Sequence, residues 1–549
     1  GWPSERGRNE ERVIRRGRPW ALAFLLGGLS VTGLPGGACG AAAAGGTTRP
    51  PALAGSWYPE SPAILLATAR DLLRQAAAAP APAGRPLALV VPHAGWAYSG
   101  VVAATAYRLL ARGEFARVVV VAPSHRGSFD GYALDDAPAY RTPLGEVPLA
   151  RDAVETLKAP GLARVVQGVT GPEHAIEIEL PFLQAVLGRF SLVPVLVGRV
   201  DAAAQEAFAL RLAMLDDGKT LFVFSSDFTH YGPRFEYSPF GPTSAARTKI
   251  RALDAAAIDL LCRVDADGFR GFVKEKDATI CGRSGLGTML ELLARIAPKA
   301  RGTLLAHWAS GEMPGSRDDS SVDYAALAYT REGGAGGPAL TTPPAMTPVD
   351  ASAPPLPEAL GRTLVRVARG ALEADLARDT ARLDMALRDL DDSTEASRLQ
   401  AVFVTLKKTD PLEIARLGEL RGCIGQVVPT YPLVLAVVKS ALDAALDDPR
   451  FPEVEASELP GLSVEVTVLS PIVPVASWGA IRIGTHGIVL EKGGRRALFL
   501  PQVAVEQKWT LEETLDHLAS KAGLGRGEWR TGARFSVFTG QLFHEERRH

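Results

Sequence analysis

The chain has 549 residues, which corresponds to about three to four domain-sized units and argues against a single compact domain. Its 60 lysines and arginines balance 61 acidic residues, and the net charge of −1 argues against a nucleic-acid binder or an acidic tail protein as a description of the whole chain. Four cysteines are too few for a disulfide framework in a chain of this length.

Residues 1–49 have the pattern of an export signal. Four arginines between residues 12 and 18 precede an apolar run at 21–26, and small residues dominate 36–46, as is typical of a secretory signal. A mis-called start is the alternative. We expect an exported or periplasmic protein if the signal is real, and a cytoplasmic one otherwise. No other stretch reaches the roughly 18 uninterrupted apolar residues of a spanning helix, so the chain is not expected to span a membrane.

A linker divides the rest of the chain. Residues 333–357 contain seven prolines, four glycines and one charged residue, and such a composition cannot bury enough apolar area to fold. We therefore predict one folded unit at 50–332 and a second at 358–549.

The first unit alternates helix and strand patterns. Helices are predicted at 62–79, at 100–111 and from residue 288, and continuous apolar runs predict strands at 87–91, 117–122, 191–197 and 220–224. Such runs suit strands that are buried on both faces. The alternation indicates an α/β domain with a mostly parallel sheet and flanking helices.

The second unit has a different order of elements. Helices are predicted at 357–376, 433–446 and 511–522, and strands at 401–405, 462–469 and 496–500. This order favours an α+β domain with a mixed or antiparallel sheet.

Three histidines each follow a predicted strand, namely His93, His125 and His230. Ligands of open α/β sheets bind outside the carboxyl ends of the strands, so we expect the three imidazoles at one crevice. Taken alone, each histidine could instead cap a helix or satisfy a turn. No compact HExxH or CxxC motif is present, so a metal site would be assembled from distant loops.

Two further residues could join that crevice. Cys281 lies in the glycine-rich run TICGRSGLG ahead of a predicted helix. A helix N-terminus lowers a thiol pKa, which suits a metal ligand or a nucleophile, and the alternative is a small buried residue in a tight turn. Asp227 stands three residues before His230 and could fix the tautomer of its ring, although a helix N-cap is an equal alternative.

The pocket walls are predicted from aromatic residues and one further histidine. Trp57 and Tyr98 lie near the predicted loops and could line a substrate pocket, with plain packing as the alternative. His174 precedes a helical pattern and is a candidate for the pocket wall or a helix cap, not for direct ligation.

Motifs of the first unit resemble the Memo family, also called AmmeMemoRadiSam system protein B. The matching segments are AGSWYP (54–59), PHAGWAYSG (92–100), PSH (123–125), EHAIEIELPFLQ (173–184), SSDFTHY (225–231) and SVDY (321–324). The second unit resembles the AMMECR family, system protein A. Its segments are VFVTL (402–406), LRGCIG (420–425), DPRFP (448–452), IGTHG (483–487), LPQV (500–503) and KAGL (521–524).

These resemblances imply a site. The Memo fold resembles the class III extradiol dioxygenases, which hold non-haem Fe(II). By that resemblance His93, His125 and Cys281 look like metal ligands, and His230 looks like the acid–base histidine. Fe(II) is the expected metal, with copper or zinc as alternatives.

The LRGCIG motif of the second unit has two interpretations. Its glycines suggest a tight, buried turn around Cys423, which is then structural, whereas Arg421 could present its guanidinium to an anionic partner.

Several functions follow as hypotheses. The resemblance implies a dioxygenase-like oxidoreductase that works with a radical SAM protein on a small aromatic or peptide substrate, with no nucleic acid as partner. The alternatives are a non-catalytic module that binds a peptide or sequesters a metal, and a zinc hydrolase, which a cysteine ligand disfavours. Whether the chain is an enzyme at all stays open at this point.

Overall fold

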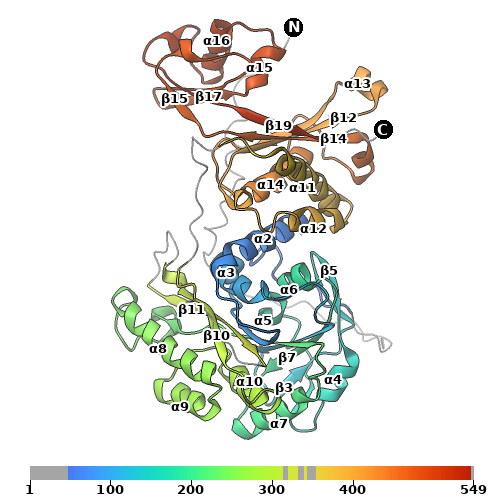
Figure 1. Ribbon diagram of the computed structural model, residues 1–549, viewed down its shortest axis with the longest axis vertical. Helices are drawn as coiled ribbons and strands as arrows, with labels where there is room; N and C mark the ends of the chain where they lie inside the picture. The colour runs from blue at the N-terminus through green and yellow to red at the C-terminus, as the bar shows by residue number, and fades with distance from the viewer. Residues whose placement is uncertain (1–46, 313–318, 332–338, 343–353, 546–549) are drawn as a thin grey trace, which may run out of the picture.

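The computed structural model describes residues 47–312, 319–331, 339–342 and 354–545, and Figure 1 shows two bodies one above the other along its long axis. The export signal and most of the proposed linker lie outside these residues, so both stay predictions. Within the described ranges, no helix combines the length and the apolar character that crossing a bilayer requires.

The first body is built on one nine-stranded sheet in the order β10-β11-β1-β8-β2-β7-β3-β6, with β9 paired to β11. Its strands are β1 (Pro86–Val91), β2 (Arg117–Pro123), β3 (Tyr132–Leu134), β6 (Ala163–Val165), β7 (Ser191–Val197), β8 (Thr220–Ser225), β9 (His230–Tyr231), β10 (Gly302–Ala309) and β11 (Ser321–Thr330). A separate hairpin consists of β4 (Ala139–Thr142) and β5 (Gly145–Pro148).

The sheet is mixed, and the expectation of a mostly parallel sheet is wrong at its edges. The central strands β1, β8, β2 and β7 are parallel, as their continuous apolar runs indicate. β10, β11 and β9 pair antiparallel on one side, and β3 pairs antiparallel with β7 on the other. The connection from β10 to β11 is too short for the crossover that parallel strands need.

Helices cover both faces of this sheet (Figure 1). One apolar cluster joins the sheet to α2, α3 and α6, and another joins it to α4, α7, α8, α9 and α10. The bounds are α2 (Pro62–Gln75), α3 (Trp96–Tyr107), α4 (Arg151–Leu157), α5 (His174–Glu177), α6 (Leu180–Leu187), α7 (Ala202–Ala213), α8 (Thr243–Arg263), α9 (Ala266–Lys276) and α10 (Arg283–Ile296).

The second body is α+β with antiparallel sheets, as its sequence pattern predicts. One sheet has the order β13-β12-β14-β19 and the other β15-β18-β16-β17. The strands are β12 (Val402–Lys408), β13 (Leu420–Gly425), β14 (Leu462–Leu469), β15 (Val473–Val475), β16 (Gly487–Lys492), β17 (Arg495–Phe499), β18 (Arg534–Phe538) and β19 (Gly540–His544). The helices are α11 (Glu358–Leu376), α12 (Ala381–Arg388), α13 (Pro411–Leu417), α14 (Leu433–Leu446), α15 (Pro501–Glu506) and α16 (Leu511–Lys521).

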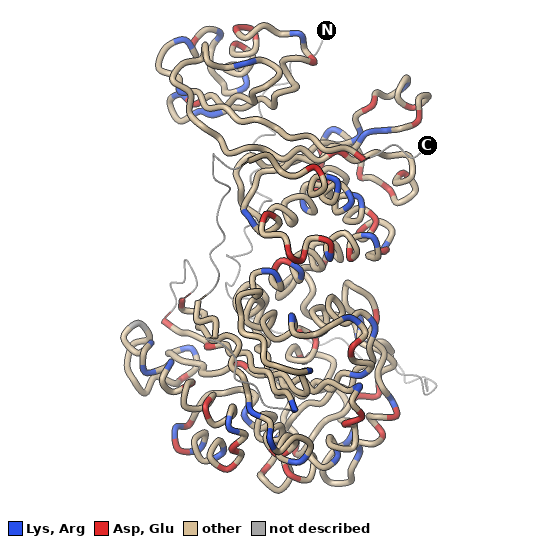
Figure 2. The backbone as a smooth tube through the Cα atoms, in the orientation of Figure 1, with Lys and Arg blue, Asp and Glu red and all other residues tan. Residues whose placement is uncertain are grey.

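The two bodies meet along α2, which packs against α11, α12 and α14. Figure 2 shows charged positions of both signs at this contact. The buried Arg70 guanidinium donates to Asp384 and Asp391, both at 3.0 Å, and to the Ala185 carbonyl at 2.8 Å. Asp375 accepts hydrogen bonds from the N-terminus of α2. The contact is therefore specified by paired charges as well as by apolar packing.

Replacing Arg70 by methionine is expected to lower the free energy of unfolding by about 2 kcal/mol, because it removes a buried guanidinium from Asp391 and the Ala185 carbonyl and leaves Asp384 with Arg112 and Arg388 alone. Arg112 is a matched control, since it bonds the same Asp384 from a side chain that is 55% exposed. Arg112→Met should cost less than about 0.5 kcal/mol. Urea unfolding of the full chain measures both values, and equal losses would contradict the assignment.

Candidate functional site

The residues of the site follow the carboxyl ends of three adjacent parallel strands. His93 lies two residues beyond β1, His125 two residues beyond β2, and Asp227 two residues beyond β8. Because β8 lies between β1 and β2 in the sheet, the carboxyl ends of these strands share one edge and bring the three residues together.

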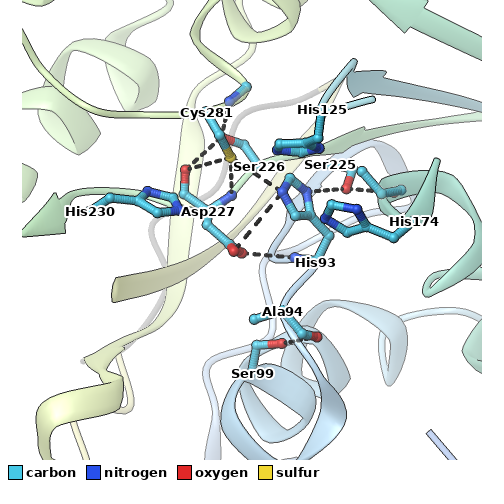
Figure 3. Close-up of polar contacts among 12 residues, drawn as sticks. His93, Ala94, Ser99, His125, His174, Ser225, Ser226, Asp227, His230 and Cys281 are labelled. Carbon is cyan, nitrogen blue, oxygen red and sulfur yellow. Dashed lines mark hydrogen bonds and ion pairs between the residues drawn. The ribbon is translucent and has the colours of Figure 1, made fainter. Parts of the chain in front are cut away.

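Three imidazoles form the centre of the site (Figure 3). The ring centroids of His93 and His125 are 5.1 Å apart, and His174 lies 5.5 Å from His93 and 4.4 Å from His125, on which it stacks. Nitrogen atoms of all three rings lie within 4.8 Å of one another. His174 comes from the short helix α5, and its place in this group was not expected for a wall residue.

Cys281 completes the group from the loop before α10. Its Sγ is 3.2 Å from His93 Nε2 and accepts the backbone N–H of Asp227 at 3.2 Å. His93, His125, His174 and Cys281 are called the histidine–cysteine cluster below. The three ligands proposed from sequence are all members of it, and their role as ligands stays a prediction.

The thiol does not have the low pKa that its place before a helix suggests. Surrounding protein atoms remove water from the sulfur, and the nearby Asp227 carboxylate adds to this effect, so the pKa of the Cys281 thiol is raised well above its usual range. Desolvation therefore outweighs the helix N-terminus. A thiolate would form at this position when a cation binds beside it.

Alkylation tests this inference about the Cys281 thiol. In metal-free protein at pH 8, Cys281 should react with iodoacetamide at least about tenfold more slowly than in the urea-unfolded chain, because the thiolate is the reactive form. Mass spectrometry of the peptides gives the rate for each cysteine. Equal rates in folded and unfolded protein would show that the thiol is not protected.

Hydrogen bonds fix the tautomer of His93. Its Nδ1 is 2.8 Å from the Ser225 hydroxyl, which itself donates to the Ala175 carbonyl. Since that hydroxyl proton is committed, Ser225 accepts from His93 Nδ1–H, and the Nε2 lone pair points to the cysteine sulfur. Burial, followed by the neighbouring histidines, lowers the pKa of His93 well below its usual value, so the ring is neutral.

His125 is fixed in the same way by Glu173. Its Nδ1 is 3.0 Å from Glu173 Oε1, and its backbone N–H donates to Oε2 at 2.6 Å. Burial opposes ionisation, but the hydrogen bonds from His125 prevail and hold the pKa of Glu173 at about 2. The carboxylate only accepts, so His125 donates from Nδ1 and keeps its lone pair on Nε2.

His230 has partners other than the one expected. Its Nδ1 is 2.9 Å from the Phe228 carbonyl and 3.0 Å from the Thr279 carbonyl, and both can only accept. The ring therefore carries its proton on Nδ1 and offers Nε2 as a base. Asp227 does not hold this ring as predicted, because its Oδ1 accepts the backbone N–H of His93 at 2.8 Å. Figure 3 shows His230 on the side of Asp227 away from His125 and His174.

A cavity of about 530 Å³ opens beside the cluster, with His125 and Cys281 in its wall. Three arginines line it, namely Arg126, Arg199 and Arg283. Guanidinium groups bind carboxylates and phosphates in a planar, two-point manner. The cavity thus suits a ligand that carries an anionic group.

The two aromatic residues predicted for the pocket differ in position. Trp57 lies against the cluster, with its ring centroid 4.7 Å from that of His174. Tyr98 is 40% exposed in the first turn of α3. Trp57 is therefore the better candidate for contact with a ligand.

The LRGCIG motif of the second body forms strand β13, so the predicted turn is wrong. Its glycines are needed for close packing, because a Cβ on Gly422 would collide with the Ala444 carbonyl of α14. The buried Arg421 pairs with Glu458 and with two carbonyls and is not presented to a partner. Cys423 accepts from the Thr405 hydroxyl at 3.2 Å. These contacts favour a structural role for the motif.

The sequence interpretation missed the residues behind the imidazoles. Glu173 holds His125, and Ser225 links His93 to the buried Glu179 at 2.9 Å. Burial raises the pKa of Glu179 to about 8. The glutamates on the two sides of His174 were a signal that acids lie near this ring, but no local pattern indicates which histidine each one holds.

The chain is similar to known proteins in both bodies. Residues 49–328 match the family described as Memo-like protein, and residues 365–543 match AMMECR1. The memo-1 homolog of Caenorhabditis elegans is 33% identical over 292 residues, which cover 51% of this chain and 81% of that protein. A protein of Methanothermobacter thermautotrophicus is 41% identical over 200 residues, or 35% of this chain and 97% of that one. The crystal structure of an uncharacterized protein from Pyrococcus horikoshii aligns with a TM-score of 0.30 and 36% identity, over 35% of this chain and 94% of that chain.

Proposed function

The chain belongs to the Memo-like protein family and carries an AMMECR1 domain in its second half, and from this premise we propose that its histidine–cysteine cluster binds a redox-active metal ion, in the first place Fe(II). The protein would then act as a dioxygenase-like oxidoreductase. Copper and zinc are the alternatives that a metal analysis decides.

The tautomers of two histidines carry this proposal. His93 and His125 commit their Nδ1 protons to Ser225 and Glu173, so both Nε2 lone pairs are left for a cation. Imidazoles held in this way by a second residue are typical of metal ligands. Cys281 would be the third ligand, and His174, whose ring stacks on that of His125, the fourth candidate. When bound, iron would supply the binding of dioxygen and the exchange of electrons with it.

The protein's own groups would handle the proton and the substrate. His230 would take or return a proton at Nε2, since its Nδ1 is held by two carbonyls. Arg126 and Arg283 of the cavity would hold an anionic group of the substrate, since Arg199 is paired with Asp130. Trp57 would contact the substrate on the His174 side of the cluster. An aromatic carboxylate or an acidic peptide meets these requirements.

The resemblance to class III extradiol dioxygenases supports the oxidoreductase proposal by analogy between folds. A cysteine stands where those enzymes use a carboxylate, so ring cleavage is not part of the proposal. The same family resemblance supports a radical SAM protein as the partner in a shared pathway. The AMMECR1 domain would recognise that partner or the substrate.

Oxygen consumption tests the proposal. The protein is purified anaerobically, loaded with Fe(II), and mixed with aerated buffer and a panel of aromatic carboxylates, acidic peptides and their neutral esters. We expect uptake above the substrate-free rate with the acids and less with the esters. Binding of the acids without any uptake would favour the non-catalytic module. Neither binding nor uptake would refute the proposed substrate class.

A further inference from the structure

A second group of ligand-type side chains lies buried next to the loop that carries His230. Asp254 comes from α8, His307 from β10 and Asp323 from β11, and α8 packs against both strands. The carboxylates are 0% and 1% exposed and the imidazole is 12% exposed. Three elements thus bring two acids and one histidine to a common point.

These side chains do not satisfy one another. His307 Nε2 is 3.4 Å from Asp254 Oδ2 and 3.6 Å from Asp323 Oδ2, which is longer than an N–H···O hydrogen bond. Among the described residues, His307 Nε2, Asp254 Oδ2 and both oxygens of Asp323 have no hydrogen-bond partner. Buried polar atoms are rarely left in this state, so the arrangement points to a missing ligand.

The spacing fits a small cation. Ligand atoms about 2.0–2.1 Å from a tetrahedral zinc ion lie about 3.4 Å from one another. The separations of 3.4 and 3.6 Å between His307 and the two carboxylates agree with this value, and the ligand-type atoms of the group lie within 4.8 Å of one another. We propose that Asp254, His307 and Asp323 form a second metal site, separate from the histidine–cysteine cluster, that binds a divalent transition ion of the Zn²⁺ or Mn²⁺ type.

The donor set selects this class of ion. Two carboxylates and a neutral imidazole balance the charge of one dication, and the imidazole suits transition ions. The absence of a thiolate from the three ligands distinguishes the site from the histidine–cysteine cluster. Mg²⁺ is disfavoured because it is bound through oxygen ligands, whereas one of the three donors here is an imidazole nitrogen.

Hydrogen bonds join this second site to the segment just before His230. Thr229 donates to Asp254 Oδ1 through its hydroxyl at 2.6 Å and through its backbone at 3.3 Å. The backbone carbonyl of Asp323 accepts from the N–H of Phe228 at 2.8 Å, and the N–H of Asp323 donates to the carbonyl of Thr229 at 3.0 Å. A cation held by the three ligands would therefore fix the segment that places His230.

Protonation of His307 would compete with the binding of a metal ion at this site. Burial alone would lower the pKa of His307, but the two carboxylates raise it to about 9. Without a cation, the group would be an imidazolium between two acids. The experiment must separate that ion triad from a metal site.

Metal content in a background without the first cluster makes this separation. The full chain carrying His93→Ala and His125→Ala is dialysed against chelator, incubated with Zn²⁺ or with Mn²⁺, and freed of excess ion by gel filtration. Mass spectrometric metal analysis should find about one ion per chain. Adding Asp323→Asn or His307→Gln should abolish retention, whereas Asp259→Asn on the exposed face of α8 should not. This result does not depend on the proposed oxidoreductase function.

Thermal melting keeps the test valid if a variant folds poorly. In chelator, each variant gives its own reference melting temperature, because Asp323→Asn also removes one of the two acids beside His307. Added Zn²⁺ should raise the melting temperature of the parent and of Asp259→Asn but not that of Asp323→Asn. Equal retention and equal stabilisation in all variants would overturn the proposal by placing the metal elsewhere. No retention by the folded parent would also overturn it and would favour the ion triad.

Discussion

Replacing His93 by alanine is expected to remove about one metal ion per chain from protein that has been loaded anaerobically with Fe(II). His93 lies between the other imidazoles and the thiol, since its ring faces His125 and His174 and its Nε2 is 3.2 Å from Cys281 Sγ. The group of three imidazoles whose nitrogen atoms lie within 4.8 Å of one another therefore includes it. We expect the loss of affinity to exceed the roughly 10- to 100-fold that follows from losing an outer partner.

The measurement is metal content per chain, with circular dichroism to show that the variant is folded. His544→Ala is a suitable control, because His544 is exposed at the last strand of the second body. It should keep the metal content of the native chain. A folded His93→Ala protein with unchanged metal content would refute the metal centre and favour the non-catalytic binding module. Copper or zinc in place of iron would keep the centre and redirect the chemistry.

The central fold was predictable because its strands are buried on both faces. β1, β2, β7 and β8 read as continuous apolar runs, and the predicted bounds lie within two residues of the observed ones. β11 was missed because its run from Ala325 to Ala328 is rich in alanine, which favours a strand no more than a helix. The antiparallel pairings at the edges of the sheet could not be predicted, because the sequence pattern did not reveal the strands that form them.

The position of the site could also be predicted, but its detailed chemistry could not. His93 and His125 meet because adjacent parallel strands end at one edge, which is a rule of topology. Glu173 lies 48 residues from His125, and Ser225 lies 132 residues from His93. No local pattern indicates such pairings. The helix N-terminus argument for Cys281 failed since it ignores the desolvation that tertiary packing imposes.

The motif resemblances of both halves are confirmed, yet they do not settle every residue. LRGCIG is distinctive in sequence, and its arginine looked available for an anionic partner. In the structure the Arg421 guanidinium pairs with Glu458 and donates to two backbone carbonyls, so it is not available to a partner. A motif can therefore be specific to a family because of packing, as the close approach of Gly422 to α14 shows.

Replacing Glu173 by glutamine should weaken metal binding at the cluster by about 10- to 100-fold without removing a ligand. The carboxylate accepts from the ring and backbone of His125 and from the backbone of His174. Glutamine keeps the shape but offers one acceptor oxygen and an amide donor, so it cannot accept on both sides. His125 then loses the partner that keeps its lone pair on Nε2.

Competition titration with a zinc indicator measures the affinity, and nitrogen NMR of the histidine rings reports the tautomer. The exposed Glu155 provides a control, and Glu155→Gln should change neither quantity. A weaker affinity with an unchanged tautomer would mean that Glu173 acts through packing alone. The pH dependence gives an independent check, because the pKa of Glu173 is about 2 in the fold against 4.5 as a free group. Its contribution to stability is complete above about pH 4.5 and is lost as the pH falls toward 2, so the native and Glu173→Gln proteins should converge in stability only in that acidic range.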